Sequence, residues 1–102
     1  MSISFIYITN KDEKEASKIA NHLLGKKLIA CANVFPISSM FTWENKSKNV
    51  KEFALFAKTK PENFEKVKVE VKKVHSYECP CIVKFDVESN KEFEDWVRSE
   101  VV

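Results

Sequence analysis

Residues 28–59 read LIACANVFPISSMFTWENKSKNVKEFALFAKT and decide the fold, because they predict one long β-hairpin. Residues 28–44 have the β-branched and aromatic content of a strand, although Pro36 predicts a bulge or bend within it. Residues 45–49 form a polar turn, and residues 50–59 form the returning strand. A strand of about 16 residues at about 3.3 Å each spans roughly 50 Å. We therefore expect part of the hairpin to project from the domain.

The segment before the hairpin predicts a strand followed by a helix. Residues 3–9 are mostly β-branched and aromatic, and apolar residues stand at both odd and even positions. This pattern is typical of a strand that is covered on both faces. Asn10 and Glu13 predict a capping pair, and Gly25, the only glycine, predicts a left-handed cap at the helix end. The helix is marked by an apolar stripe at helical spacing: Ala16, Ile19, Ala20, Leu23 and Leu24.

The segment after the hairpin predicts a helix, a strand and a short last helix. Residues 61–74 begin with a proline and end with two lysines, as a helix does, although alternating valines between residues 67 and 71 also fit a strand. The start and stop signals favour the helix. In residues 81–87 apolar residues alternate with two charged ones, which predicts a strand. Ser89 together with Glu92 predicts the N-terminal cap of the last helix.

This order of elements predicts an α+β fold of the ferredoxin-like split βαβ type, βαββαβ plus a C-terminal helix, in a single domain over residues 1–102. Both crossover helices of such a fold cover one face of the sheet, so the second face of a monomer should be polar. It is apolar instead, because Phe53 and Leu55 point one way while Ala54 and Phe56 point the other. We expect another copy of the chain to cover it.

Composition narrows the class of protein. The 102 residues carry 17 Lys and Arg against 15 Asp and Glu, and the signs are interleaved along the chain. This pattern argues against a nucleic-acid partner, which requires a concentrated basic patch. No apolar stretch approaches the ~20 residues of a membrane span, and three cysteines without a secretory signal favour reduced thiols. We expect a cytoplasmic protein with no membrane partner.

Chemically versatile side chains gather in residues 74–81, VHSYECPC, between the predicted second helix and the last strand. His75, Glu78, Cys79 and Cys81 offer ligands suited to transition metals. The spacing does not match a closed zinc site, which needs four ligands in two pairs. Two alternatives stay open: the cysteines are small packing residues, or His75 only caps the preceding helix.

Three other positions carry weaker signals. Cys31, between two alanines on a predicted strand, fits a packing thiol better than a nucleophile, because no partner base is visible. Lys58 and Thr59 end a strand close to a helix start, where an anion can bind. Trp43 lies near the hairpin tip, far from a local core, and we expect it to pack on a neighbouring subunit.

Taken together, these motifs resemble the CutA divalent-cation-tolerance proteins. The resemblance runs in order through almost the whole chain, as Lys27-Leu-Ile-Ala-Cys-Ala-Asn33, Pro36, Ser39, Trp43, Lys58-Thr59, His75-x-Tyr77-Glu78-x-Pro80 and Trp96. It implies a ferredoxin-like homotrimer of interlocking hairpins and sheet edges and a role in tolerance of divalent ions, copper above all. We expect no enzymatic activity, because no pair of catalytic partners can be named in the sequence.

The same resemblance implies which residues act. It places a cleft between subunits, lined by the matching positions Cys31, Asn33, Lys58, Thr59, His75, Tyr77 and Glu78. We expect the trimer interface to include Phe41, Trp43 and Phe53. Copper or another divalent metal is the implied ligand, and none is required for folding.

Three positions depart from the family pattern. Ser76 stands where proline is usual, Asn45 where glycine is often seen, and Cys81 where a second carboxylate is common. Exchanging a carboxylate for a thiol favours a soft ion such as Cu(I) over a hard cation.

Three functions follow from these patterns. The first is a non-enzymatic, trimeric protein that binds or responds to metal ions through the four candidate ligands. The second is a sensor that holds a small anion in the intersubunit cleft with Lys58, His75 and Tyr77. The third, an enzyme with Cys31 or His75 as nucleophile or base, has the least support because no catalytic partner can be named.

Overall fold

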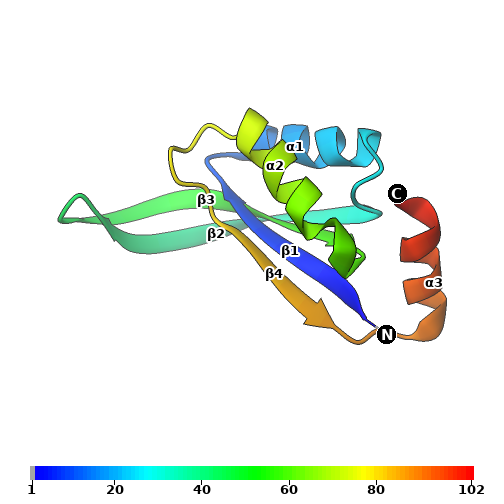
Figure 1. Ribbon diagram of the computed structural model, residues 1–102. Coiled ribbons are helices and arrows are strands. Elements are labelled where there is room, and N and C mark those ends of the chain that lie inside the picture. The colour runs from blue at the N-terminus through cyan, green and yellow to red at the C-terminus, as the bar shows by residue number, and fades with distance from the viewer. Residues whose placement is uncertain (1) are drawn as a thin grey trace.

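The computed structural model describes residues 2–102 as one four-stranded sheet with three α-helices. Helices α1 and α2 lie on the same face of the sheet, and α3 stands at one end of it, beside the start of β1 (Figure 1). In chain order the elements are β1 (Ile3–Asn10), α1 (Glu13–Gly25), β2 (Cys31–Trp43), β3 (Lys46–Thr59), the 3-10 turn η1 (Pro61–Asn63), α2 (Phe64–Val74), β4 (Ile82–Val87) and α3 (Lys91–Glu100).

The strand order β2-β3-β1-β4 confirms the predicted ferredoxin-like fold. β1 pairs antiparallel with both β3 and β4, and β3 pairs antiparallel with β2. The two units β1-α1-β2 and β3-α2-β4 therefore interleave their strands, as a split βαβ arrangement requires. The alternative of a strand over residues 67–71 is wrong, because these residues lie within α2.

The β2-β3 hairpin projects as expected, but its details differ from the prediction. The register runs without a break from the Cys31–Lys58 pair to the Trp43–Lys46 pair, so Pro36 causes no bulge. β2 is an edge strand, where a missing N–H is tolerated. The turn is shorter than residues 45–49, since Glu44 and Asn45 alone make it, both with positive φ. The hairpin gives the molecule its 45 Å long axis (Figure 1).

Both predicted caps of α1 are wrong. The helix begins after Asp12, whose side chain accepts a hydrogen bond from the Glu15 N–H at 2.8 Å, while Asn10 is the buried last residue of β1. At the other end Lys27, not Gly25, takes the left-handed conformation, with φ of 57°. The Leu28 N–H bonds to the Leu23 carbonyl, which closes a Schellman motif and returns Leu28 to the core.

Gly25→Ala is therefore expected to stabilise the protein by about 0.5–1 kcal/mol. Gly25 has no positive φ and no atom within 4 Å of an added Cβ, so alanine fits without strain. Lys27→Gly, which relieves the left-handed lysine, should add about 1 kcal/mol. Urea unfolding of both variants checks this. A loss of stability in the alanine variant would mean that Gly25 is the cap after all.

The core lies between the sheet and the two crossover helices. The side chains of β1 and β3 that face α1 and α2 are completely buried, as are those that the helices present to the sheet. The main members are Ile6, Ile8, Leu55, Ala57, Ile19, Leu23, Val67 and Val71. The buried residues confirm the stripe predicted for α1 up to Leu23, whereas its last predicted member, Leu24, is 38% exposed.

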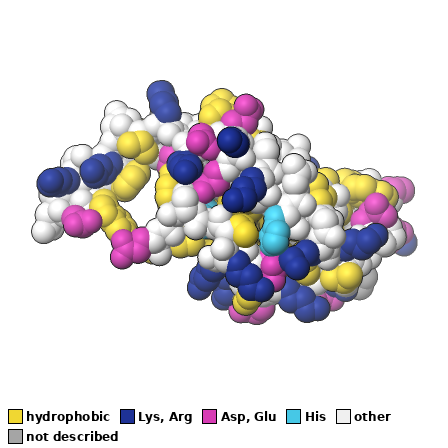
Figure 2. All heavy atoms as spheres, turned by 90° about the horizontal axis from the view of Figure 1, so that it is seen from above, with side chains coloured by type: hydrophobic (Ala, Val, Ile, Leu, Met, Phe, Trp, Pro, Cys, Tyr) yellow, Lys and Arg dark blue, Asp and Glu magenta, His cyan; other side chains and the backbone are white. Residues whose placement is uncertain are grey.

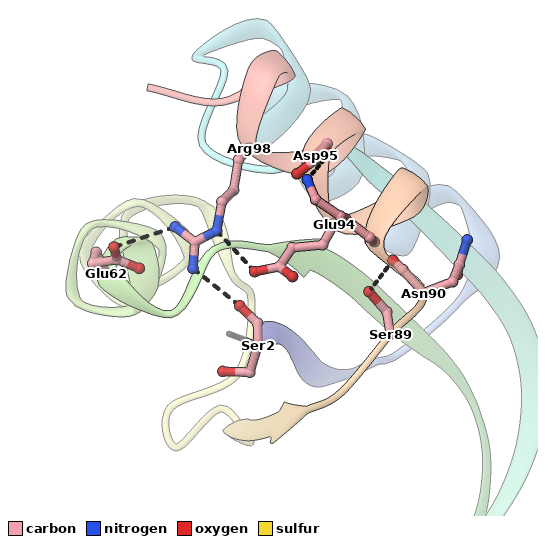
Figure 3. A network of polar contacts seen from close by, with 8 residues as sticks. Ser2, Glu62, Ser89, Asn90, Glu94, Asp95 and Arg98 are labelled. Atoms are coloured by element: carbon pink, nitrogen blue, oxygen red, sulfur yellow. Dashed lines mark hydrogen bonds and ion pairs between the residues drawn. The ribbon is translucent and has the colours of Figure 1, made fainter.

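Helix α3 is fixed to the body by the Arg98 guanidinium (Figure 3). It donates to the Ser2 carbonyl at 3.1 Å, to Glu94 at 3.3 Å and to Glu62 at 3.4 Å, so one side chain joins α3, the N-terminal strand and η1. The predicted Ser89 cap is wrong: the helix begins after Asn90, and the Ser89 hydroxyl bonds to the Asn90 carbonyl instead.

Candidate functional site

The face of the sheet opposite α1 and α2 carries a cluster of aromatic rings. Along β1 and β3, the buried core residues point to the side of the helices, and the side chains that alternate with them point to this opposite face. The ring of Phe56 lies 5.3 Å from Tyr7, 5.7 Å from Phe35 and 5.8 Å from Phe5, measured between centroids. We call this the open face, because its outer residues stay exposed: Phe35 by 36%, Val83 by 42% and Phe85 by 49%.

The open face continues onto the projecting hairpin. Phe41 and Trp43 share the parity of Phe35 on β2 and are 45% and 41% exposed. Phe53, the third residue predicted for the trimer interface, has the opposite parity and lies half-buried on the helix-covered side. Seen from that side, Lys, Arg, Asp and Glu lie beside one another over the helices (Figure 2). Phe35, Phe41 and Trp43 lie on the opposite side of the sheet, although each helix also exposes one large apolar side chain: Leu24, Val69 and Trp96.

The loop from His75 to Cys81 joins α2 to β4 and is held by the imidazole of His75. The His75 Nε2 atom lies 2.8 Å from the Thr9 carbonyl oxygen, and the Tyr77 N–H donates to His75 Nδ1 at 3.0 Å. The rings of His75 and Tyr77 are 4.9 Å apart. Neither ring nitrogen is left free for another partner.

A buried carboxylate of α1 provides a second anchor for the loop. Glu15, 7% exposed, accepts hydrogen bonds from the N–H of Ser76 at 3.0 Å and of Lys11 at 3.2 Å. Burial opposes ionisation of Glu15, but these hydrogen bonds outweigh it and lower its pKa below the usual value. The carboxylate therefore holds the loop in its charged form.

A third anchor joins the loop to the hairpin. The Tyr77 hydroxyl donates to the carboxylate of Glu52, which is only 6% exposed on β3. Burial and the bond to Glu52 both raise the pKa of Tyr77, so the phenol stays protonated. Sequence reasoning missed Glu15 and Glu52. Glu15 lies beside the apolar stripe of α1, four residues before Ile19. Glu52 shares the side of Ala54 and Phe56 on β3. A charged residue in each of these apolar surroundings is the signal that could have found them.

The three cysteines are free thiols with different exposure. Cys79 is exposed, whereas Cys31 and Cys81 are half-buried. Burial raises the pKa of Cys81, and the nearby charge of Glu52 adds to the effect. Burial also raises the pKa of Cys31, although Lys58 opposes it. Neither half-buried thiol is primed as a nucleophile at neutral pH.

The predicted metal ligands do not converge within one chain. Glu78 and Cys79 are exposed in the loop, Cys81 is half-buried beside β4, and His75 is engaged as described. Across residues 2–102, no group of three or more His, Cys, Asp and Glu side chains could hold a metal ion. A four-ligand site would therefore need rearrangement or a second subunit.

The residues predicted to line a cleft separate onto two sides of the sheet. Cys31 pairs with Lys58 and Asn33 with Phe56, all on the open face. The Lys58 ammonium lies 5.5 Å from the Phe5 ring centroid and 5.8 Å from that of Phe93 on α3. Thr59 points the other way and is fully buried.

Thr59 has a structural contact of its own. Its hydroxyl donates to the Leu28 carbonyl at 2.7 Å and receives a hydrogen bond from the Asn63 amide at 3.2 Å. This link connects the end of β3 to the segment before β2. Thr59 is thus not brought together with Lys58 in a single chain.

A ferredoxin-like sheet with a projecting hairpin and an open aromatic face defines the structural class of the chain. Comparison with known proteins then gives its family. The sequence model of the CutA1 divalent ion tolerance proteins matches residues 4–100. The chain therefore belongs to the CutA1 family.

Two prokaryotic relatives and one solved structure agree with the chain over nearly their whole length. The divalent-cation tolerance protein CutA of Archaeoglobus fulgidus is 50% identical over 95 residues, covering 92% of this chain and 93% of that protein. That of Thermotoga maritima is 37% identical over 98 residues, covering 95% and 97%. The solved structure of the Thermus thermophilus protein superposes with a TM-score of 0.93 at 33% identity, covering 98% of this chain and 99% of that one.

Proposed function

We propose that this chain serves divalent-cation tolerance as a homotrimer that binds transition-metal ions, copper above all, without catalysing a reaction. The observation that carries the proposal is the open face, which runs from the sheet onto the hairpin and leaves large apolar side chains exposed. Exposed apolar surface of this kind marks an interaction site. Three copies are what the family resemblance implies.

Burial of the open face would supply ample free energy for assembly. Fully burying one large apolar side chain is worth about 1.5–3 kcal/mol. Seven large apolar side chains on this face and the hairpin are more than a third exposed: Phe35, Met40, Phe41, Trp43, Val50, Val83 and Phe85. The projecting hairpin offers the reach to contact a neighbour, so a second and third copy are the occupants we propose.

Within the loop, the two thiols of Cys79 and Cys81 are the ligands that we propose for the metal. A thiolate pair suits a soft ion such as Cu(I), which does not require the four ligands of a structural zinc site. Glu78 is exposed beside them and is the candidate oxygen ligand. A further ligand would come from a neighbouring subunit.

Titration of the assembled protein with Cu(I), Cu(II) and Zn(II) tests the metal proposal. We expect Cu(I) to bind most tightly. The double variant Cys79→Ser, Cys81→Ser should lose at least about 100-fold in affinity, because losing ligands costs more than the ~10–100-fold of an outer-shell change. Cys31→Ser is the matched control and should keep the wild-type affinity. Equal affinity in the double variant would remove these thiols from the site.

The absence of a proposed catalytic role has physical support. The raised pKa values of Cys31 and Cys81 make both thiols poor nucleophiles at neutral pH. The family is named for tolerance of divalent ions and not for a reaction.

A second candidate function is a sensor of small anions. Lys58 lies between aromatic rings on the open face, and among residues 2–102 it has no carboxylate within ion-pair distance. A thermal-shift screen distinguishes the two functions: stabilisation by phosphate and carboxylates, lost in Lys58→Gln and not produced by metals, would favour the sensor.

We also propose a cytoplasmic location. No helix in residues 2–102 is long and apolar enough to cross a membrane. The relatives are described with different compartments, the Arabidopsis thaliana protein as chloroplastic and the Archaeoglobus fulgidus protein as periplasmic. Fractionation of the source cells checks the location.

A further inference from the structure

The hydrogen bonds of His75 fix where its ring proton lies. The Thr9 partner of Nε2 is a backbone carbonyl, which can only accept a hydrogen bond. The Tyr77 partner of Nδ1 is a backbone N–H, which can only donate one. Nε2 must therefore carry the proton and Nδ1 the lone pair. Both contacts together are possible only for the neutral Nε2–H tautomer.

This arrangement leaves the imidazole without a lone pair for a metal ion. The lone pair of Nδ1 is used by the Tyr77 N–H, and Nε2 is protonated and directed at Thr9. Coordination at either nitrogen would break one of the two bonds.

We infer that His75 is a positioning residue, fixed as the neutral Nε2–H tautomer, which orients the loop bearing Cys79 and Cys81 and is not itself a metal ligand. The part that concerns metal rests on the proposed function, whereas the tautomer and the positioning role do not. A site without imidazole selects against ions that prefer nitrogen ligands and in favour of Cu(I).

The loop geometry explains what His75 positions. Its Nδ1 holds the Tyr77 backbone, and the Tyr77 hydroxyl reaches Glu52 on the hairpin. Glu15 holds the intervening Ser76. The segment that leads into Cys79 is thus tied to β1, α1 and β3, and His75 makes the tie at its start.

NMR of the histidine ring nitrogens tests the tautomer, in ¹⁵N-labelled, metal-free protein at neutral pH. We expect His75 to show one protonated nitrogen, Nε2, and one unprotonated nitrogen, Nδ1. His22, the only other histidine, is the internal reference, and His22→Gln assigns the signals. A doubly protonated ring or an Nδ1–H tautomer for His75 would overturn the inference.

Three variants separate positioning from ligation. His75→Ala should speed amide exchange at Tyr77 about tenfold, the equivalent of one hydrogen bond. His75→Asn restores an acceptor near the Nδ1 position and should recover the protection. His75→Gln carries its amide further out, toward the Nε2 position beside Thr9 and past the Nδ1 position, and should not recover it. Equal exchange in the alanine and asparagine variants would contradict the positioning role.

Addition of Cu(I) tests the ligand set. X-ray absorption should show sulfur scattering without imidazole in the wild type and in His75→Asn, and the His75 nitrogens should keep their tautomer. Imidazole scattering, or loss of the Nε2 proton on copper addition, would overturn the inference. If the wild type binds no copper, the proposed metal function fails, while the tautomer and the asparagine rescue still decide the positioning role.

Discussion

Phe56→Lys is expected to convert the assembled protein into single subunits. Phe56 is the centre of the open face, with the rings of Phe5, Tyr7 and Phe35 within 5.8 Å of its centroid. An ammonium there removes about 3 kcal/mol of apolar burial from each subunit and places a charge in an apolar contact. Because three copies contribute, the effect on assembly multiplies. Light scattering coupled to size exclusion measures the mass.

Two further variants keep this prediction decisive. Phe35→Lys changes a ring that is already 36% exposed, so it weakens assembly with little effect on the fold of one subunit. Val69→Lys is the matched control, because Val69 is 53% exposed on α2, away from the open face. Circular dichroism verifies that each variant folds. Wild-type mass in both phenylalanine variants would show that the open face is not the interface.

Glu15→Ala is expected to lower the free energy of unfolding by about 3 kcal/mol. The change leaves the Ser76 and Lys11 N–H groups without their carboxylate, and a hydrogen bond to a charged group is worth about 1.5–3 kcal/mol. Glu13→Ala is the matched control, since Glu13 lies exposed in the same first turn of α1. Urea unfolding measures both. A loss below about 1 kcal/mol would mean that solvent replaces the carboxylate.

The same carboxylate gives stability a defined pH dependence. The pKa of Glu15 in the folded protein is lowered from 4.5, so its contribution is complete above that value and is lost as the pH falls through the folded pKa. Glu15→Gln should lack this part of the acid destabilisation. Unfolding of both proteins between neutral pH and acid measures the difference. Parallel profiles would contradict the role of the charge.

The long-range pattern of the fold was predictable from the sequence, whereas the ends of its elements were not. The alternation of apolar residues in strands and their stripes on helices both reflect burial, the largest favourable part of the free energy of folding. These patterns therefore predicted the sheet and its helices correctly. The only glycine suggested a cap at Gly25, but Lys27 takes the left-handed position because Leu28 must return to the core there. The packing of Leu28 outweighed the local preference of lysine.

The candidate site was predictable in its residue types and not in its contacts. The open face was predictable because apolar residues point to both sides of β3. The loop was predictable because chemically versatile side chains gather in it. The anchors Glu15 and Glu52 meet Ser76 and Tyr77 across 61 and 25 residues of chain, a pairing that no local pattern encodes. The engagement of His75 Nε2 likewise depends on Thr9, 66 residues away.

The mass of the unmodified protein in solution tests the central proposal, that copies of this chain cover the open face and complete the site. Sedimentation equilibrium at micromolar concentration should give three times the mass of one chain, stable on dilution. A folded species with the mass of a single chain would contradict it, because large apolar side chains of the open face would then remain in water.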